Sequence, residues 1–181
     1  LLSISIILYQ IGDIEIYVFL LYLISILFGV LVFNFPLGKI FIGDSGAYIV
    51  GLYIAGFSII LAEKNISPFV IVQILIFPSY ELIRSFIRRL IKDKKSVLKP
   101  DKKHLHSVLH TFNTRVSCLN ELSANILSSL LIILIQIINF TYIISFYNNE
   151  LLVFIGIISF IIIYEITYYF IVKRIKIFEN K

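Results

Sequence analysis

Five long runs with at most one charged residue dominate this chain of 181 residues. They lie at residues 16–33, 45–62, 65–80, 122–147 and 151–172, and the last of them is interrupted only by Glu165. A helix needs about 20 mostly apolar residues to cross the hydrocarbon core of a bilayer. Because the runs are continuous rather than alternating, and because a backbone in lipid must satisfy its own hydrogen bonds, they predict membrane-spanning helices rather than a barrel.

The composition agrees with a membrane protein. Apolar residues make up 59% of the chain and charged residues 15%, whereas an ordinary soluble domain has about 25% charged residues. This excludes a disordered chain and argues against a soluble domain. The single cysteine, Cys118, excludes a disulfide framework, and its residue type predicts a free buried thiol.

The predicted fold is an all-α polytopic membrane helix bundle. We expect about five transmembrane helices, a partial one at residues 1–11 and short amphipathic cytoplasmic helices. The chain has no methionine and begins Leu1-Leu2 within an apolar run. We therefore expect residues 1–181 to form a single membrane domain that is the C-terminal part of a longer protein.

Basic residues are concentrated in alternate segments between the spans. Residues 34–44, 84–121 and 173–181 contain 15 of the 16 lysines and arginines, and only Lys64 lies elsewhere. The positive-inside rule places these three segments in the cytoplasm and the intervening loops on the other side. Topology thus accounts for the net charge of +5, and no nucleic-acid partner is expected.

Asp44 is the candidate functional carboxylate of the segment at 34–44. It lies at the predicted start of a membrane helix, with Gly43 before it and Gly46 shortly after. An ionised carboxylate at this depth is costly unless it is hydrated, paired or bound to a cation. Asp44 is also a candidate N-cap of the helix, and the two interpretations are compatible.

The segment after Glu81 has the pattern of an amphipathic helix leaving the membrane. Its apolar positions are Ile83, Phe86, Ile87, Leu90 and Ile91, and its basic positions on the other side are Arg84, Arg88 and Lys92. The basic side could bind phosphates of a substrate or anionic headgroups, or simply be solvated. Glu165, inside the last span, is expected to pair with a tyrosine or to be solvated at the interface, and Tyr168 is expected to be an interfacial anchor.

A third segment, residues 99–110, combines lysines with all three histidines of the chain, His104, His106 and His110. Leu105, Val108 and Leu109 have helical spacing, and Asp101 is placed to cap the helix. A helix N-terminus flanked by Lys102, Lys103 and His104 predicts binding of a phosphate or diphosphate. Zinc binding by His106 and His110 is the competing interpretation, which the lack of nearby cysteine or an H-E-x-x-H pattern disfavours.

The order and spacing of these motifs are more specific than any one of them. The sequence contains Asn34-x-Pro36-x-x-Lys39-x-Phe41-x-Gly43-Asp44-x-Gly46, then Arg88-Arg89, then Pro100-Asp101-x-x-His104-x-His106. Together they resemble the C-terminal half of the polyprenyl-phosphate N-acetylhexosamine-1-phosphate transferases, the bacterial glycosyltransferase family 4 that includes the pentapeptide translocase of peptidoglycan synthesis. The resemblance covers about residues 16–112.

The resemblance implies an enzyme of the bacterial plasma membrane that initiates cell-wall or surface polysaccharide synthesis. It would transfer a sugar 1-phosphate from a UDP-N-acetylhexosamine to undecaprenyl phosphate and release UMP. The resemblance also implies Mg²⁺, with Mn²⁺ as the alternative ion. The oligomeric state is left open, with a homodimer as one alternative.

The resemblance implies site residues at the positions of this sequence that match the family motif. Asp44 resembles the metal-associated aspartate of the family, Asn34 and Lys39 lie in the same motif, and His104 and His106 resemble its histidine motif near the nucleotide diphosphate. We therefore expect catalytic roles for Asp44, His104 and His106. The expected substrate-binding residues are Asn34, Lys39, Arg84, Arg88, Arg89, Lys102 and Lys103.

Two departures from the family pattern shape these expectations. His104-Leu105-His106 replaces the three consecutive histidines of the translocase branch, which favours a UDP-N-acetylhexosamine donor over a pentapeptide donor. The paired aspartates of the family belong to an earlier half, so we expect this part alone to be inactive. The alternative function is a non-catalytic membrane protein, a transporter or a lipid-binding relative, that recognises anionic headgroups.

Overall fold

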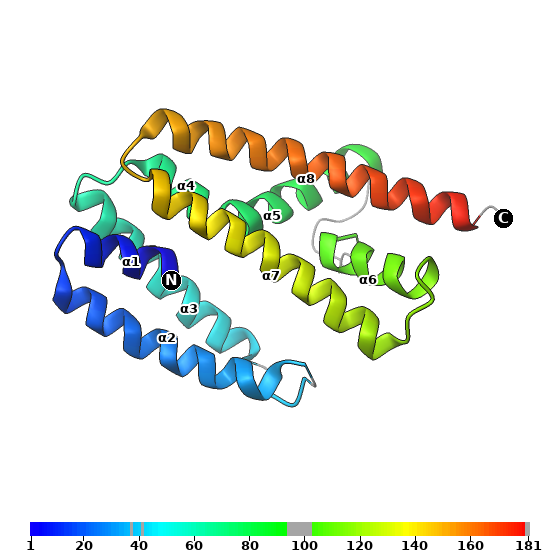
Figure 1. The fold of residues 1–181 in the computed structure, drawn as a ribbon, viewed down its shortest axis with the longest axis horizontal. Helices are drawn as coiled ribbons and strands as arrows, with labels where there is room; N and C mark the ends of the chain where they lie inside the picture. The colour runs from blue at the N-terminus through cyan, green and yellow to red at the C-terminus, as the bar shows by residue number, and fades with distance from the viewer. Residues whose placement is uncertain (37, 41, 94–102, 180–181) are drawn as a thin grey trace.

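The computed structural model describes residues 1–36, 38–40, 42–93 and 103–179, and all regular structure within these ranges is helical. The helices in chain order are α1 (Leu2–Gln10), α2 (Ile14–Asn34), α3 (Gly43–Glu63), α4 (Pro68–Ile74), α5 (Ile76–Arg88), the π-helical turn η1 (Arg89–Asp93), α6 (Leu105–Arg115), α7 (Glu121–Phe146) and α8 (Glu150–Glu179) (Figure 1).

Four helices, α2, α3, α7 and α8, are long and apolar enough to cross a membrane, and α4 with α5 makes a fifth if the bent pair counts as one span. The prediction of an all-α polytopic bundle is confirmed. The short span expected at residues 65–80 corresponds to the pair α4 and α5, which meet at an angle of 75°. The break follows from Pro78, which lacks an N–H and whose ring would clash with the carbonyl of Ile74 in a continuous helix.

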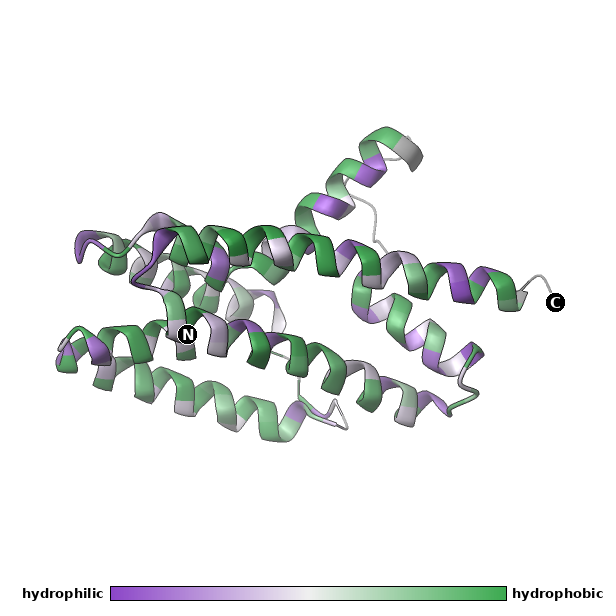
Figure 2. Ribbon diagram, turned by 45° about the horizontal axis from the view of Figure 1, so that its top comes forward, coloured by the Kyte–Doolittle hydropathy of each residue, from purple (hydrophilic) through white to green (hydrophobic). Residues whose placement is uncertain are grey.

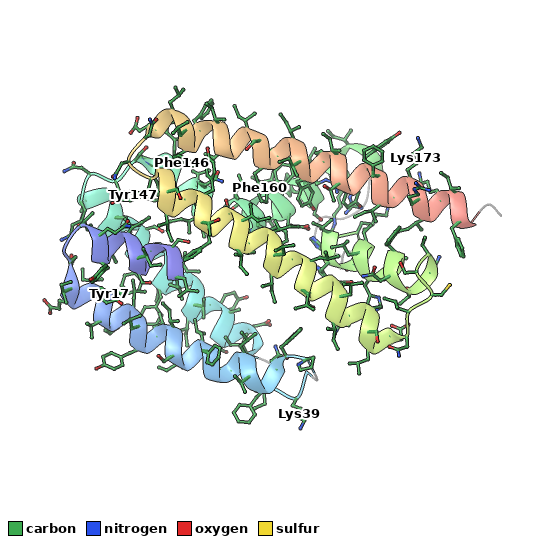
Figure 3. The ribbon with its side chains drawn as sticks, viewed as in Figure 1. Tyr17, Lys39, Phe146, Tyr147, Phe160 and Lys173 are labelled. Atoms are coloured by element: carbon green, nitrogen blue, oxygen red, sulfur yellow. The ribbon has the colours of Figure 1, made fainter. Side chains whose placement is uncertain are left out.

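The loops divide between two ends of the bundle. The α1–α2, α3–α4 and α7–α8 connections lie at one end, and the α2–α3 loop, α6 and the C-terminal end of α8 lie toward the other (Figure 1). Tyr17 and Tyr147 mark the first end, and Lys39 and Lys173 mark the second (Figure 3). The distribution of basic residues predicted the same division of the loops between two sides. The assignment of the second end to the cytoplasm stays a prediction.

Two buried apolar clusters hold the helices together. One lies where α1 packs against α2, α3 and α7, and includes Ile4, Ile7, Leu20 and Ile143. The other joins α6 to α8. There, Leu105, Val108 and Leu109 pack against Tyr164 and Tyr168. The predicted amphipathic helix after His104 is thus confirmed, and its apolar face packs on the last membrane helix.

Polar side chains fix individual helix ends and contacts. Asp13 caps α2 by accepting the N–H of Ile16, and also forms an ion pair of 2.6 Å with Lys64, which joins the α1–α2 turn to the end of α3. Between α4 and α7, the buried Gln73 donates to Asn139 at 2.7 Å. Such hydrogen bonds between helices stabilise their packing in an apolar surrounding.

Most of the outer surface is apolar, as a lipid-facing surface requires. Figure 2 shows green, hydrophobic residues along the long helices and purple, hydrophilic ones mainly toward their ends. The apolar side of α5 and η1 is also open. Its residues Ile83, Phe86, Ile87, Leu90 and Ile91 are each between 48% and 70% exposed. The projecting α5 therefore presents apolar side chains to lipid or to another part of the protein.

Candidate functional site

Glu81 is the centre of a polar cluster between α5, α6 and α8. Its Oε2 lies 2.8 Å from Nδ1 of His104, and its Oε1 accepts the backbone N–H of Leu105 at 3.0 Å and the hydroxyl of Tyr164. The side chain is only 13% exposed. Leu105 is the first residue of α6, so the carboxylate also stabilises the positive end of that helix.

This contact bears on the phosphate site that was predicted at the start of α6. The first amide of α6 was expected to be part of a phosphate site, but it donates to Glu81. An incoming anion at this amide would have to compete with a carboxylate that is already bonded. Of the residues named for that site, Lys103 is exposed and His104 is half-buried at the N-cap position. Lys102 and the expected cap Asp101 lie outside the described residues.

Arg84 of α5 forms an ion pair with Glu165 of α8. Its Nε lies 2.5 Å from Oε1 of Glu165, and the hydroxyl of Tyr80 donates to the same oxygen at 2.8 Å. The expected tyrosine pairing of Glu165 is confirmed, while its arginine partner was not predicted. Because a carboxylate now compensates much of its charge, Arg84 is held in place rather than presented alone to a ligand.

Tyr168 connects this ion pair to the start of α6. Its ring centroid lies 3.5 Å from the guanidinium carbon of Arg84, and its hydroxyl donates to the carbonyl of Lys103 at 3.0 Å. The side chain is buried, with 8% exposed. The expected role as an interfacial anchor is therefore wrong, because Tyr168 faces the helix bundle rather than the membrane boundary.

The ring of His106 stacks beside that of His104, with centroids 6.0 Å apart and planes 7° from parallel. Partial burial of the ring, together with the nearby His104, holds the pKa of His106 below its ordinary value. His106 is therefore neutral near pH 7. It can donate or accept a hydrogen bond there but does not add a fixed positive charge.

Arg88 and Arg84 line a groove of about 270 Å³ on the side of α5 that faces α8. The other walls are Tyr80, Ile83, Ile87 and Ile91, with Glu165 at the α8 side. Arg88 is half-buried, as is Arg89 at the C-terminal end of α5. The groove thus combines guanidinium groups with aliphatic walls, a combination that suits a phosphate attached to an apolar chain.

The loop between α2 and α3 forms a separate part of the candidate site. Asn34 is the last residue of α2, Lys39 is exposed in the loop, and Asp44 is exposed in the first turn of α3. Asp44 is not the N-cap, contrary to the expectation, because α3 begins one residue earlier and its cap is Ile42. A carboxylate in the first turn still interacts favourably with the helix dipole.

A glycine is required where this loop turns into α3. Gly43 has φ of +67°, a left-handed conformation that side chains with a Cβ rarely adopt. The conformation sets the direction in which the first turn of α3 leaves the loop. Gly43 is therefore needed to place Asp44 where it is.

The two parts of the candidate site lie at the same end of the bundle without touching. Figures 1 and 2 show α7 running between the α2–α3 hairpin and the α6–α8 pair. Among the described residues, no hydrogen bond or ion pair joins Asn34, Lys39 or Asp44 to the cluster around Glu81. Within the described residues, Asp44 and the histidines therefore belong to two separate groups of side chains.

The predicted metal site is incomplete in the part of the chain that the structure describes. There, no group of three or more histidine, cysteine, aspartate or glutamate side chains could hold a metal ion. This also counts against zinc at His106 and His110. One carboxylate, that of Asp44, does not satisfy the six or so oxygen ligands that Mg²⁺ requires.

Glu81 and Tyr164 are the residues that sequence reasoning missed. Glu81 is the single acid between Glu63 and Asp93 and follows an uncharged run. A lone acid next to a predicted span is a signal for a paired or functional carboxylate. No comparable signal marks Tyr164, which is one of 11 tyrosines.

These features define a class: a multi-pass helical membrane protein with arginine, histidine and carboxylate side chains clustered at one end. Comparison with known proteins shows which family within this class the chain resembles. Residues 1–62 match the model of glycosyl transferase family 4. This match contains the motif from Asn34 to Gly46 and ends before the histidine segment. The predicted resemblance to the family is thus confirmed for the N-terminal third of the chain.

Curated relatives agree with the family match. The chain is 36% identical over 88 residues to the undecaprenyl-phosphate alpha-N-acetylglucosaminyl 1-phosphate transferase of Thermotoga maritima, a match that covers 49% of this chain and 28% of the relative. It is 38% identical over 92 residues to the decaprenyl-phosphate N-acetylglucosaminephosphotransferase of Mycobacterium leprae, covering 43% and 23%. A probable undecaprenyl-phosphate N-acetylglucosaminyl 1-phosphate transferase of Bacillus subtilis is 33% identical over 87 residues, covering 46% and 24%.

The chain spans about a quarter of the length of these relatives. No solved structure matches it significantly.

Proposed function

We propose that this chain is part of a membrane enzyme that transfers N-acetylhexosamine 1-phosphate from a UDP-sugar to a polyprenyl phosphate. The observation that carries the proposal is the family match over the segment that contains Asn34, Lys39 and Asp44. The names of the relatives specify a polyprenyl phosphate acceptor and an N-acetylglucosaminyl 1-phosphate group.

The chemistry is a phosphoryl transfer between two anionic substrates. An oxygen of the lipid phosphate bonds to the phosphorus that carries the sugar, and the bond from that phosphorus to the bridging oxygen breaks. UMP leaves with the bridging oxygen, and the product is a lipid diphosphate-linked sugar. Because both substrates are negative, fixed positive charge near the reacting groups lowers the barrier.

The groove on α5 supports the acceptor assignment. Arg88 stands beside Ile83, Ile87 and Ile91, so a phosphate at its guanidinium group could extend its apolar chain along the isoleucines toward lipid. Arg84, which is held by Glu165, would add a hydrogen-bond donor at the edge of the same groove. Lys39, at the same end of the bundle, adds positive charge (Figure 3). We assign Arg89, Lys102 and Lys103 to the same basic surface on sequence grounds.

Mg²⁺, or Mn²⁺, is part of the proposal, with Asp44 as one ligand. The described residues do not complete a site for it, and we assign no step to the ion. The remaining ligands would come from the earlier part of a longer enzyme, so this chain alone is expected to be inactive. We further propose a location in the bacterial plasma membrane, with the α2–α3 loop, α6 and the C-terminus cytoplasmic, and a role in cell-wall or surface polysaccharide synthesis.

The test is an assay of the intact protein in membranes. UDP-N-acetylglucosamine and other UDP-sugars are offered with undecaprenyl phosphate and Mg²⁺, and UMP release and lipid-linked sugar are measured. We expect UMP release that requires the lipid, stops with EDTA and is lost in Asp44→Asn. No turnover with any donor in a folded preparation would contradict the proposal.

A second function has an observation in its favour. The groove that suits a polyprenyl phosphate suits any anionic lipid headgroup, so a lipid-binding relative without catalysis would use the same residues. In that case, the assay would show no UMP release, while vesicles with anionic lipid would still bind the protein more tightly than neutral vesicles.

A further inference from the structure

Another groove, the α7–α8 groove, lies between these two helices and has a volume of about 380 Å³. Its inner wall includes the buried Gln73 of α4 and Leu105 of α6, while Ile138 and Ile163 in its outer wall are 60% and 63% exposed. Phe160, labelled in Figure 3, also lines it. The groove therefore opens to the lipid-facing surface, and its volume lies in the range of about 300–1,000 Å³ that is typical of ligand pockets.

An aromatic ring bounds the end of this groove nearest the α7–α8 turn. Tyr142 and Gly156 both line the groove, and a Cβ at Gly156 would overlap the ring of Tyr142. The hydroxyl of Tyr142 donates to the carbonyl of Leu152 at 2.5 Å, which fixes the ring there. From Gly156 the wall continues along α8 to Thr167, a length of about 16 Å at about 1.5 Å per residue. The shape suits an extended apolar chain.

Two side-chain amides in the wall fix each other's orientation. Nδ2 of Asn139 donates to the backbone carbonyl of Gln73 at 3.1 Å, so Oδ1 of Asn139 faces the Gln73 side-chain amide. Nε2 of Gln73 donates to that Oδ1 at 2.7 Å. Oε1 of Gln73 is buried and accepts no hydrogen bond from the residues that the structure describes. Exchanging the oxygen and nitrogen of Gln73 would bring two oxygens together, so the atom without a partner is the acceptor.

An acceptor without a partner is costly in this position. Gln73 is 2% exposed and lies in the bent pair of α4 and α5, within the membrane-spanning part of the chain. A hydrogen-bond donor in the α7–α8 groove would remove this cost. None of the residues that line the groove is charged, so it offers no counter-ion to an anionic headgroup. The donor should therefore belong to an uncharged ligand.

We propose that the α7–α8 groove binds an uncharged long-chain amphiphile, whose hydroxyl donates to Oε1 of Gln73 and whose apolar chain lies along α8. The groove on α5, which contains arginines, suits a phosphate instead. Leu105 and Tyr164 line the α7–α8 groove, and both donate to Glu81. The bound chain therefore packs against two residues that hold the start of α6. The proposal goes beyond the proposed function and does not depend on turnover.

The test is photolabelling of the intact protein in phosphatidylcholine vesicles, with dodecanol that carries a diazirine on its chain. We expect labelled peptides from α7 and α8 that contain wall residues such as Ile135 and Ile163. At equal mole fraction in the membrane, dodecanol should compete about fivefold or more better than dodecyl methyl ether, which has the same chain and an oxygen but no donor. Equal competition would overturn the hydrogen bond to Gln73, and this comparison requires no variant to fold.

Ser159→Trp tests the place of the chain. Ser159 lines the groove and donates to the carbonyl of Gly156 in its own helix, so a bulky ring there should fill the groove without disturbing the pair of amides. Labelling should fall about tenfold or more. Ile162→Trp is the matched control, because Ile162 is 52% exposed on the same helix and does not line the groove. Its labelling should stay within about twofold, and equal labelling of the two variants would overturn the proposal.

Gln73→Leu tests the assigned acceptor. In this variant, dodecanol and its methyl ether should compete equally, within about twofold. A preference for dodecanol that persists would overturn the role of Oε1. Absence of labelling on α7 and α8 in the unsubstituted protein would also overturn the proposal, and is the result expected if a helix from another part of a longer protein covers the groove.

Discussion

Arg84 and Glu165, on α5 and α8, form a 2.5 Å ion pair across 81 residues of sequence. The neighbouring α8 residues Tyr164 and Tyr168 contact Glu81 and the carbonyl of Lys103. The last helix, α8, thus contacts both α5 and the start of α6. It does so by hydrogen bonds and by the packing of its tyrosines on α6. The arrangement of the histidine segment depends on a helix that contains none of the family motifs.

Glu165→Gln should lower the free energy of unfolding by about 1 kcal/mol. The change leaves the Arg84 guanidinium, whose side chain is 18% exposed, without its charged partner. The loss is smaller than for a buried pair because Glu165 is 45% exposed. Denaturant titration of the protein in mild detergent measures it. Glu63→Gln, at the exposed end of α3, is the control and should change stability by less than about 0.5 kcal/mol.

The membrane spans could be predicted because each is a run of about 20 apolar residues, a length set by the bilayer. The contacts between them could not. Spans such as α2 and α8 are apolar on all sides, so their sequences do not show which side faces lipid and which faces another helix. The pairing of Arg84 with Glu165 and the burial of Tyr168 depend on that choice.

The motif residues could be named from the sequence, but not their partners. The helical spacing of Arg84 and Arg88 correctly predicted that they lie on the same side of α5. Its bend from α4 is explained by Pro78, whose effect within an uncharged run was not anticipated. Glu81 reaches His104 because α5 and α6 both pack on α8, a tertiary arrangement that spacing alone does not encode.

Gly43→Ala should destabilise the protein by about 1 kcal/mol and displace the start of α3. The reason is the φ of +67° at Gly43, which costs an alanine about 1–2 kcal/mol. Gly51→Ala is the matched control in the same helix. A Cβ at Gly51 meets nothing within 4 Å, and alanine is the better helix former, so stability should be unchanged or slightly higher. Equal unfolding midpoints for the two variants would contradict the assigned strain.

His106 should make the protein less stable in mild acid. Partial burial and the nearby His104 lower its pKa in the folded state, whereas the unfolded chain has the ordinary value of about 6.5. As the pH falls below about 6.5, the unfolded state binds a proton that the folded state does not, so the free energy of unfolding decreases until the folded pKa is passed. The loss should be smaller in His106→Gln. NMR titration of the ring checks the direction of the pKa shift, and a midpoint above 6.5 would contradict it.

Cys118 provides a test of the predicted orientation. It is exposed, contrary to the expected buried thiol, and lies in the connection between α6 and α7 at the basic end of the bundle. If this end is cytoplasmic, a membrane-impermeant maleimide should leave Cys118 unmodified in intact cells and modify it after lysis. The intact protein is used, with any cysteine outside this chain replaced.

The matched control places the thiol at the opposite end. Asn148 is exposed in the connection between α7 and α8, so Asn148→Cys in a Cys118→Ser background should react in intact cells. Because α7 alone separates the two positions, both should not react from the same side. Modification of Cys118 from outside, with protection of Asn148→Cys, would invert the topology and place the basic segments outside the cell, against the positive-inside rule.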